Sequence, residues 1–175
     1  RALDASLAFY EGLLGFRVLR RDASTAELAA HGDDTVLVHL DADPRRRPVA
    51  PRSRLGLFHV AYLLPDRAHL GALLRHLVEA RHRVGMADHA VSEAIYLSDP
   101  DGLGVEVYAD RPRAHWEVRG GELVMGTEPL DTASLLTAAA GRPWTGLPAG
   151  TRVGHLHLHV GDLAEGDRFY ADVLG

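Results

Sequence analysis

The sequence has 175 residues, which is enough to bury a hydrophobic core as one domain or as two small modules. Its formal net charge of -5 at pH 7 argues against a nucleic-acid partner, because a protein that binds a duplex needs a basic face. No apolar run reaches the roughly 18 residues that would span a bilayer and cysteine is absent, so we expect a cytoplasmic protein with no membrane partner and no disulfides.

A short repeat stands at the two ends of the chain. Phe9–Gly15 reads FYEGLLG and Phe169–Gly175 reads FYADVLG, and each copy closes a stretch with the apolar spacing of a helix. The shared glycine suits a helix end, because glycine adopts a left-handed backbone conformation without strain. The second copy belongs to a predicted helix, Asp162–Leu174, which follows a predicted strand, Val153–Val160. No such strand precedes the first copy, so we expect a fragment of a longer protein; the alternative is a natural permutation in which the terminal strand fills the missing place.

Three short strands and a linker are predicted after the first copy. The strands are separated by turn residues and are expected at Phe16–Arg21, Thr25–Ala30 and Thr35–Leu40. The linker Asp41–Arg54 is rich in proline and arginine. Its basic residues are expected in a solvated loop rather than in a phosphate site: Arg45, Arg46, Arg47, Arg52 and Arg54.

A second unit with the order β-α-β-β-β is predicted after the linker. It opens with an apolar strand, Leu55–Leu64, and a helix, Asp66–Ala80. Asp66 follows a proline and can cap this helix, whose leucines at helical spacing would form a buried stripe. The three remaining strands are expected at Arg83–Ala87, Ser92–Leu97 and Gly104–Tyr108.

The stretch Arg111–Thr151 contains many glycines and prolines, so we predict a connection with modest structure and one helix, Asp131–Ala140. Together these predictions give an α+β fold built from paired βαβββ modules. The expected division is a first module without its first strand at residues 1–50, a complete second module at 51–112, a connecting segment at 113–151, and the first strand and helix of a third module at 152–175.

His59 and Glu106 are the first candidates for a metal site. Period-two alternation places His59 on one defined face of its strand, and Glu106 is opposite in phase to its valine neighbours in a later strand. With 11 histidines and no cysteine, any bound metal would be held by imidazole and carboxylate, which suits Fe(II), Mn(II), Ni(II) or Zn(II). On periodicity alone, a hydrogen-bonded core histidine and a surface glutamate are the simpler interpretation.

Longer motifs resemble a known superfamily. The stretch Asp88–Gly102, running into Gly104–Tyr108, together with the FYxxxLG repeat resembles the signature of the vicinal oxygen chelate superfamily. This superfamily includes glyoxalase I, fosfomycin- and bleomycin-resistance proteins and type I extradiol dioxygenases. The nearest likeness is to the catechol 2,3-dioxygenase-like branch, whose members carry four modules in two pairs. The motifs that carry this likeness are Gly56–Pro65, Val91–Leu97 and Tyr108–Pro112 with Trp116.

The resemblance implies a metal ligand on the first strand of a module and another on its last strand, which correspond to His59 and Glu106. A third ligand would come from the first strand of the partner module, which this sequence lacks. His155 holds the equivalent position in the third module. It is a weaker candidate, because it would normally face a fourth module and could join the other two only through permutation or strand exchange. His157 and His159 share its face, so the pattern does not single it out.

Two residues are candidates for catalytic roles. His89 resembles a histidine that lies beside the substrate in related dioxygenases, although it could equally end a strand beside Asp88. Tyr108, like Tyr96, could donate a hydrogen bond into the cavity or pack as a core aromatic residue.

The principal hypothesis implied by the resemblance is a metal-dependent extradiol dioxygenase, an oxidoreductase that cleaves a catechol-like ring with Fe(II) and dioxygen. One alternative is a glyoxalase-like lyase or isomerase that uses Zn(II) or Ni(II) as a Lewis acid. Another is a non-catalytic binding protein of the bleomycin-resistance type, which needs no metal. The expected partners are a small aromatic substrate, dioxygen and further copies of the chain in a homo-oligomer. Metal analysis would separate the three hypotheses.

Overall fold

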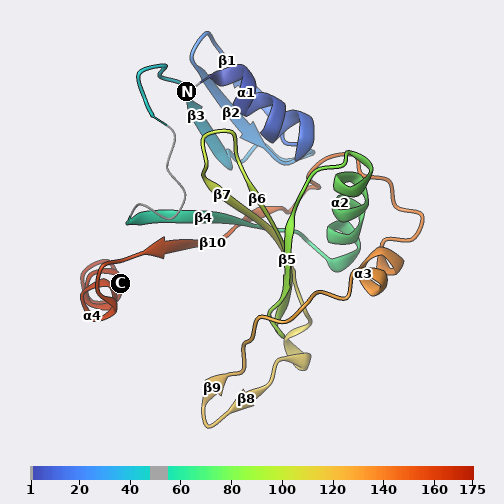
Figure 1. Cartoon of the computed structure of the whole chain (residues 1–175), viewed down its shortest axis with the longest axis vertical. Coiled ribbons are helices and arrows are strands. Elements are labelled where there is room, and N and C mark those ends of the chain that lie inside the picture. The colour runs from blue at the N-terminus through green and yellow to red at the C-terminus, as the bar shows by residue number, and fades with distance from the viewer. Residues whose placement is uncertain (1, 48–54) are drawn as a thin grey trace.

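The computed structural model describes residues 2–47 and 55–175, and its first unit is a helix packed against a small sheet (Figure 1). Helix α1 (Leu3–Leu7) continues into a wider π-helical segment, η1 (Ala8–Leu13). Three antiparallel strands follow in the order β1-β2-β3, with bounds β1 (Arg17–Arg21), β2 (Thr25–Ala29) and β3 (Val38–Asp41). Gly15 adopts a φ of 73° directly after the helical segment, as the repeat predicts.

The strand β3 begins three residues later than predicted, and aspartate side chains hold the irregular segment before it. The Asp33 carboxylate accepts a hydrogen bond from the backbone N–H of Thr35, and Asp34 pairs with Arg17. In the linker that follows, Arg45 and Arg46 are exposed and pair with nearby aspartates, which agrees with a solvated loop. Residues 48–54, with Arg52 and Arg54, lie outside the described residues.

The second unit follows the predicted order of one strand, one helix and three strands. Its elements are β4 (Gly56–Leu63), α2 (Arg67–Glu79), β5 (Gly85–Asp88), β6 (Ser92–Ser98) and β7 (Gly104–Asp110). The strands belong to a five-stranded sheet with the order β10-β4-β7-β6-β5, in which only β4 and β7 run parallel to each other. Asp66 caps α2 as predicted, because its carboxylate accepts from the backbone N–H of His69 at 2.9 Å.

The connection after β7 is more structured than predicted. It contains the short 3-10 helix η2 (Arg113–His115), the hairpin of β8 (Val118–Arg119) and β9 (Glu122–Leu123), and helix α3 (Thr132–Ala138). The hairpin turns at Gly120 and Gly121, whose φ angles of 62° and 89° are the left-handed values that a two-residue hairpin loop requires. Strands this short show no alternation in the sequence, which is why the hairpin was not predicted.

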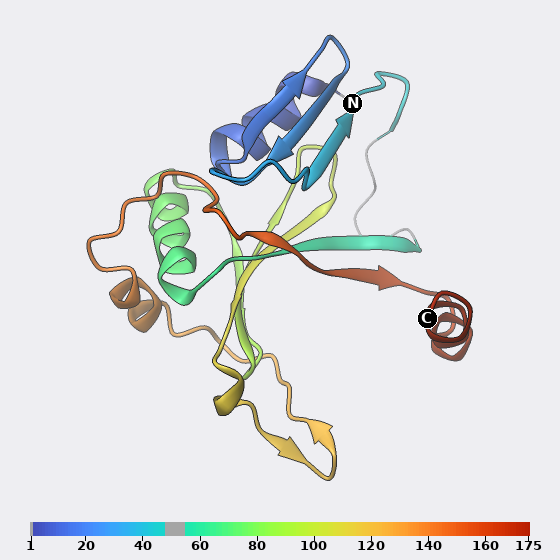
Figure 2. The ribbon, with the colours of Figure 1, turned by 180° about the vertical axis from the view of Figure 1, so that it is seen from behind.

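The strand β10 (Arg152–His159) lies at the edge of the large sheet and pairs antiparallel with β4. The strand thus joins the sheet of the second unit and has no hydrogen-bonded pairing with the described three-stranded sheet of the first unit. After β10 the predicted C-terminal helix divides into α4 (Leu163–Asp167) and the π-helical η3 (Arg168–Val173), which repeats the division of α1 and η1. The α4–η3 segment stands apart from the other helices in both views (Figure 1, Figure 2).

The two copies of the repeat differ in burial. In the first copy the apolar residues Phe9, Tyr10 and Leu14 are at most 7% exposed, whereas Phe169 and Tyr170 of the second copy are 49% and 46% exposed. The first helix joins a core that also contains the leucines of α2 and the valines of β7. Among the described residues, no helix is both long and apolar enough to cross a bilayer.

The opposite face of the large sheet carries a second, smaller apolar cluster. It consists of Ala61, Leu63, Ala94 and Tyr108, with Tyr96 packed against it. Period-two alternation separates the faces: Val105 and Val107 of β7 lie in the main core, and Glu106 and Tyr108 point to the other side. The predicted phase of His59 and Glu106 therefore places both on the face of this smaller cluster.

Gly71 allows α2 and α3 to approach each other closely. A Cβ atom at this position would overlap the backbone oxygen of Leu135 and come within 2.8 Å of the Ala139 side chain. We expect Gly71→Ala to lower the free energy of unfolding by about 1–3 kcal/mol, the usual cost of overpacking. The measurement is urea denaturation followed by circular dichroism.

Gly12 provides the matched control, because a Cβ atom there would meet nothing within 4 Å. Gly12→Ala should leave stability unchanged or raise it by about 0.5–1 kcal/mol through the lower conformational entropy of the unfolded chain. Equal unfolding free energies for the two variants would contradict the close contact between α2 and α3.

Candidate metal centre

Three neighbouring strands bring His59, Glu106 and His155 together. In the register of the sheet, Ala61 of β4 lies opposite Glu106 of β7 on one side and opposite His155 of β10 on the other. His59 precedes Ala61 by two residues and so points to the same face. Because alanine has a short side chain, the three longer side chains converge above it.

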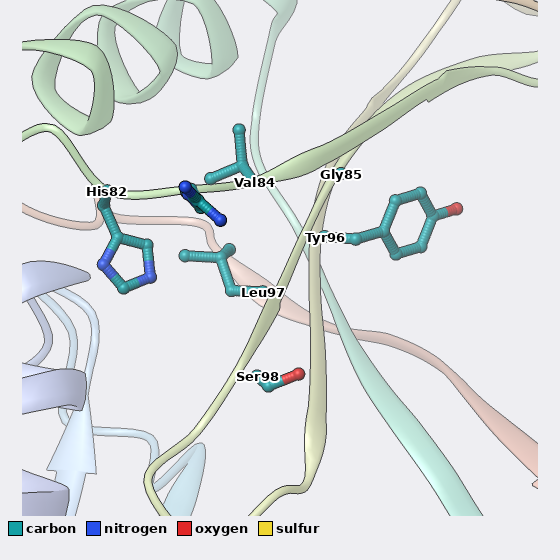
Figure 3. Close-up of a pocket in the computed structure, with 7 residues that line it drawn as sticks. His82, Val84, Gly85, Tyr96, Leu97 and Ser98 are labelled. Atoms are coloured by element: carbon teal, nitrogen blue, oxygen red, sulfur yellow. The ribbon is translucent and has the colours of Figure 1, made fainter. Parts of the chain in front are cut away.

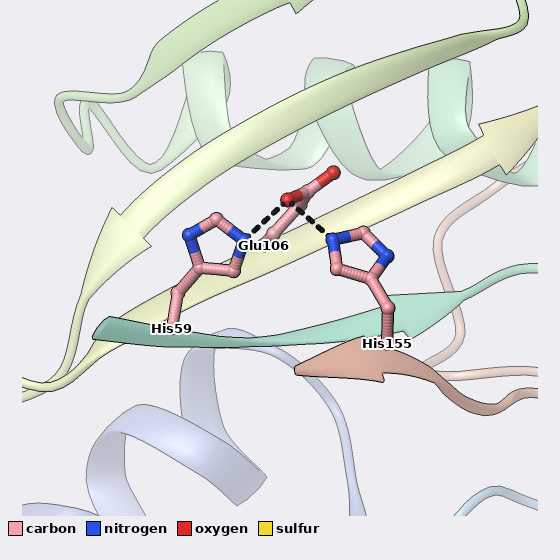
Figure 4. Close-up of side chains that lie close together, drawn as sticks. All are labelled: His59, Glu106 and His155. Atoms are coloured by element: carbon pink, nitrogen blue, oxygen red, sulfur yellow. Dashed lines mark ion pairs between the residues drawn. The ribbon is translucent and has the colours of Figure 1, made fainter. Parts of the chain in front are cut away.

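The donor atoms of these residues meet at one carboxylate oxygen. Nε2 of His59 is 2.9 Å from Oε2 of Glu106, and Nε2 of His155 is 3.4 Å from the same oxygen. Figure 4 shows the two imidazoles approaching the carboxylate from opposite sides. One donor atom from each residue lies within 4.8 Å of the others, and among the described residues no other group of three His, Asp or Glu side chains does so.

Two of the three residues are buried, which makes the charge of Glu106 costly. Glu106 is 3% exposed and His59 is 6% exposed, while the His155 side chain is 45% exposed. A buried carboxylate away from water is costly unless a cation or several donors offset its lost hydration. Glu93, which is equally buried, is met by two arginines, but within the described residues the ion pairs of Glu106 are with imidazoles alone.

The orientation of His59 fits a metal ligand better than an ion pair. Its Nε2 atom is buried and has no hydrogen-bond partner in the structure, although it lies 2.9 Å from Glu106. The two atoms are close, but they do not form a hydrogen bond. Two imidazoles and one carboxylate with open positions suit a divalent transition metal, which would accept the lone pair of this nitrogen.

Two glycines make room for the site, and sequence reasoning did not single them out. Gly104 lies opposite His59 across β4 and β7, and a Cβ atom there would be 2.8 Å from Cβ of His59. Gly154 lies at an irregularity in β10, and a Cβ atom there would overlap the Tyr108 hydroxyl. A larger residue at either position would displace a side chain of the site.

Tyr96 and His89 form a hydrogen-bonded pair beside the candidate ligands. Tyr96 of β6 lies opposite Glu106 in the sheet, and its ring centroid is 5.8 Å from that of His59. The Tyr96 hydroxyl is 2.7 Å from Nε2 of His89, whose Nδ1 is 2.7 Å from the backbone oxygen of Gly126. A carbonyl oxygen can only accept, so Nδ1 carries the proton and Nε2 accepts from Tyr96 in the neutral ring.

The environment keeps Tyr96 protonated. Burial raises the pKa of its hydroxyl above the ordinary value, and the negative charge of Glu106 raises it further. Tyr96, which the sequence offered beside Tyr108 as a donor or as a core aromatic residue, connects His89 to the face of the candidate ligands.

The other predicted residues of this face lie at its margin. Tyr108 is 8% exposed with its ring centroid 5.2 Å from that of His155, and burial raises the pKa of its hydroxyl. The ring centroids of His157 and His59 are 4.7 Å apart. Burial and the neighbouring imidazoles lower the pKa of His157. His159 stacks on Phe58. Neither His157 nor His159 belongs to the three converging donors, so the structure distinguishes His155 from the two histidines that share its face.

A surface hollow of about 480 Å³ lies elsewhere on the second unit. Its lining residues are His82, Arg83, Val84, Gly85, Tyr96, Leu97 and Ser98. Figure 3 shows the Tyr96 ring extending to the opposite side of the strand from the Leu97 and His82 side chains. The Tyr96 hydroxyl therefore points away from this hollow, which contains none of the three converging donors.

Comparisons with known proteins agree with the sequence motifs. The family model described as Glyoxalase/Bleomycin resistance protein/Dioxygenase superfamily matches residues 1–107. A protein of Bacillus subtilis (strain 168) named catechol-2,3-dioxygenase is 49% identical over an alignment of 176 residues, which covers 100% of this chain and 61% of that protein. The chain thus spans less than two thirds of the length of this relative.

Solved structures share the fold at low sequence identity. The cppA protein of Streptococcus pneumoniae TIGR4 matches with a TM-score of 0.61 at 14% identity, over 90% of this chain and 57% of that one. A glyoxalase/dioxygenase of Nostoc punctiforme matches with a TM-score of 0.50 at 23% identity, over 62% of this chain and 84% of that one. Both likenesses concern the arrangement of strands and helices.

Proposed function

Because the chain belongs to the glyoxalase/bleomycin resistance protein/dioxygenase superfamily, we propose that it is part of a metal-dependent extradiol dioxygenase that cleaves a catechol-like ring. The observation that carries the proposal is the buried, unpartnered Nε2 of His59 beside the buried carboxylate of Glu106. The name of the B. subtilis relative, catechol-2,3-dioxygenase, supports this chemistry over the others in the superfamily. Since that relative is longer than this chain, the activity is proposed for the whole protein.

The proposed metal ligands are His59, Glu106 and His155, with Fe(II) as the proposed ion. A bound Fe(II) would supply the path for electrons between an aromatic diol and dioxygen, which do not react directly. The sheet holds His59 and Glu106 on two strands that are hydrogen-bonded in parallel, so their side chains are in place before any ion arrives. His155 adds the third donor from the edge strand.

Apolar residues surround the proposed ligands and keep the site dry. Ala61, Leu63 and Ala94 form one surface on the same face of the sheet as the three donors, and all three are buried. These side chains already shield the carboxylate of Glu106, which is 3% exposed, from water. Exclusion of water strengthens every electrostatic interaction in the site.

Tyr96 and His89 are proposed to accept a proton from the substrate. A catechol whose oxygens bound a metal would lose protons, and Nε2 of His89, which accepts the Tyr96 hydrogen bond, would receive one through that hydroxyl. In this step the Tyr96 oxygen takes the proton of the substrate hydroxyl while the Tyr96 proton passes to Nε2 of His89. The backbone oxygen of Gly126 keeps its hydrogen bond with Nδ1 throughout and stabilises the resulting imidazolium.

A glyoxalase-like isomerase is the second candidate, because two imidazoles and one carboxylate also suit Zn(II) or Ni(II). The test is oxygen uptake by the full-length protein with a panel of substituted catechols, after reconstitution with Fe(II) or with Zn(II). We expect oxygen uptake and a yellow ring-cleavage product with Fe(II) alone. Turnover of a hemithioacetal by the Zn(II) form, without oxygen uptake by either form, would favour the isomerase instead.

A further inference from the structure

His89 lies in a tight turn that is held by many contacts. The turn connects β5 to β6, and the backbone N–H of His89 donates to the Ser92 oxygen at 2.9 Å. Ala90 adopts a φ of 67°, which is unfavourable for a residue with a Cβ atom. The Asp88 carboxylate accepts a hydrogen bond from the backbone N–H of Ala90 at 2.8 Å. Backbone hydrogen bonds of 2.9 Å join Asp88 to Glu128 in both directions and fix one end of the turn, so further support is needed at the strained Ala90.

Arg111 supplies that support from the end of β7. Its guanidinium donates to both carboxylate oxygens of Asp88, at 2.5 and 2.7 Å, and to the backbone oxygen of Ala90 at 3.1 Å. Its own backbone N–H donates to the oxygen of Val91 at 2.8 Å. These hydrogen bonds hold the pKa of Asp88 below its ordinary value, so the pair stays charged. Arg111 thus contacts the turn on both sides of His89.

The buried carboxylate of Glu93 also holds the Arg111 guanidinium. Arg111 donates to the carboxylate of Glu93 at 3.1 Å, and Glu93 is only 2% exposed. Glu93 is held in turn by Arg67, which also donates to Ser134 of α3. The network connects the turn of His89 to the β6 strand and to α2, so Arg111 has little freedom to move.

We propose that Arg111 is a positioning residue that fixes the ring of His89 between Gly126 and Tyr96. This inference rests on the proposed function only in assigning His89 a proton-accepting role. The planar Arg111 guanidinium binds both carboxylate oxygens of Asp88 and the backbone oxygen of Ala90 at the same time. The ammonium group of a lysine has no such planar arrangement of donors and would fix the turn less well. Among the described residues, the Arg111 guanidinium is hydrogen-bonded to neither the candidate ligands nor Tyr96, so its effect on the reaction would pass through His89.

Arg111→Lys tests the proposal and Arg67→Lys is its matched control. Both variants keep the charge opposite Glu93, but only Arg111 contacts the turn. In the full-length protein loaded with diamagnetic Zn(II), nitrogen-15 NMR of the His89 ring reports which nitrogen carries the proton. We expect wild-type protein and Arg67→Lys to show the Nδ1–H form, and Arg111→Lys to show a mixture of both forms. With Fe(II), kcat should fall about tenfold in Arg111→Lys at unchanged KM and iron content, and less than twofold in Arg67→Lys.

The two readouts separate this inference from the proposed function. If wild-type protein turned over no catechol, the proposed function would fail, but the NMR comparison would still decide whether Arg111 positions His89. If Arg111→Lys and Arg67→Lys gave the same His89 spectrum, the positioning role would be wrong whatever the activity. A loss of folded signal in Arg111→Lys would be checked with Asp88→Asn, which removes the charge of the partner and should give the same mixture of ring forms.

Discussion

Glu106→Gln is expected to weaken the binding of Fe(II) or Zn(II) by at least about a hundredfold, because the neutral amide replaces the charged ligand on which both imidazoles converge. Glutamine has nearly the same shape, so the packing around Ala61 should survive. His59→Ala should cause a loss of similar size, since it removes the buried donor. The measurement is calorimetric titration with Zn(II), together with the iron content after reconstitution.

Two variants of β10 histidines are expected to lose less metal affinity in the same titration. His155→Ala should weaken metal binding less, by about tenfold, because its side chain is half exposed and water can replace the lost donor. His157→Ala is the matched control, since His157 lies on the same strand, beside His59, but outside the three converging donors. Unchanged metal affinity in both Glu106→Gln and His59→Ala would show that the ion binds elsewhere.

His89→Gln is expected to reduce kcat by about a hundredfold or more while the protein keeps its iron, because general base catalysis contributes gains of that order. Tyr96→Phe removes the hydroxyl that passes the substrate proton to His89, so we expect a comparable loss of kcat. The double variant should lose little more than either single variant, since residues that act as one unit are not additive. The measurement is steady-state oxygen uptake at saturating catechol, with iron determined on the same samples.

The pH dependence of the reaction provides a control for Tyr96. Burial and the charge of Glu106 raise the pKa of the Tyr96 hydroxyl, so its proton is retained at pH values where an exposed tyrosine would lose it. An alkaline limb in kcat near pH 10 that disappears in Tyr96→Phe would contradict this description. Additive losses in the double variant would likewise show that His89 and Tyr96 act separately.

The sequence was sufficient to identify the unit that carries the site. Period-two alternation gave His59 and Glu106 each a defined face of its strand, because the phase of a regular strand is visible locally, and the resemblance paired them as candidate ligands. The motif around Asp88–Gly102 gave the superfamily, which the family model and the 49% identical relative confirm. The cap of α2 was predicted for the same reason, since Asp66 and its acceptor geometry depend only on neighbouring residues.

The remaining features of the site depend on contacts between distant segments. The resemblance left His155 a weaker candidate, because its strand would normally face a fourth module, whereas the structure places it beside Glu106 through the pairing of β10 with β4. Strand pairing of this kind follows no spacing rule. The partner of His89 at Gly126 belongs to the connection after β7, and the clearance at Gly104 depends on how closely two strands approach. Neither is visible in a pattern of residue types.

Because β10 is an edge strand, His155 is held less firmly than His59 and Glu106, which lie on interior strands. β4 and β7 each have a hydrogen-bonded strand on both sides, while β10 has one such neighbour among the described residues. Marginal segments detach locally at a smaller free energy than interior ones. When β10 detaches, His155 leaves with it, and His59 and Glu106 remain as a two-donor half-site. The rates of metal binding and release would then depend on the local opening of β10. A variant that changes this opening would alter these rates and leave the melting temperature of the whole chain unchanged.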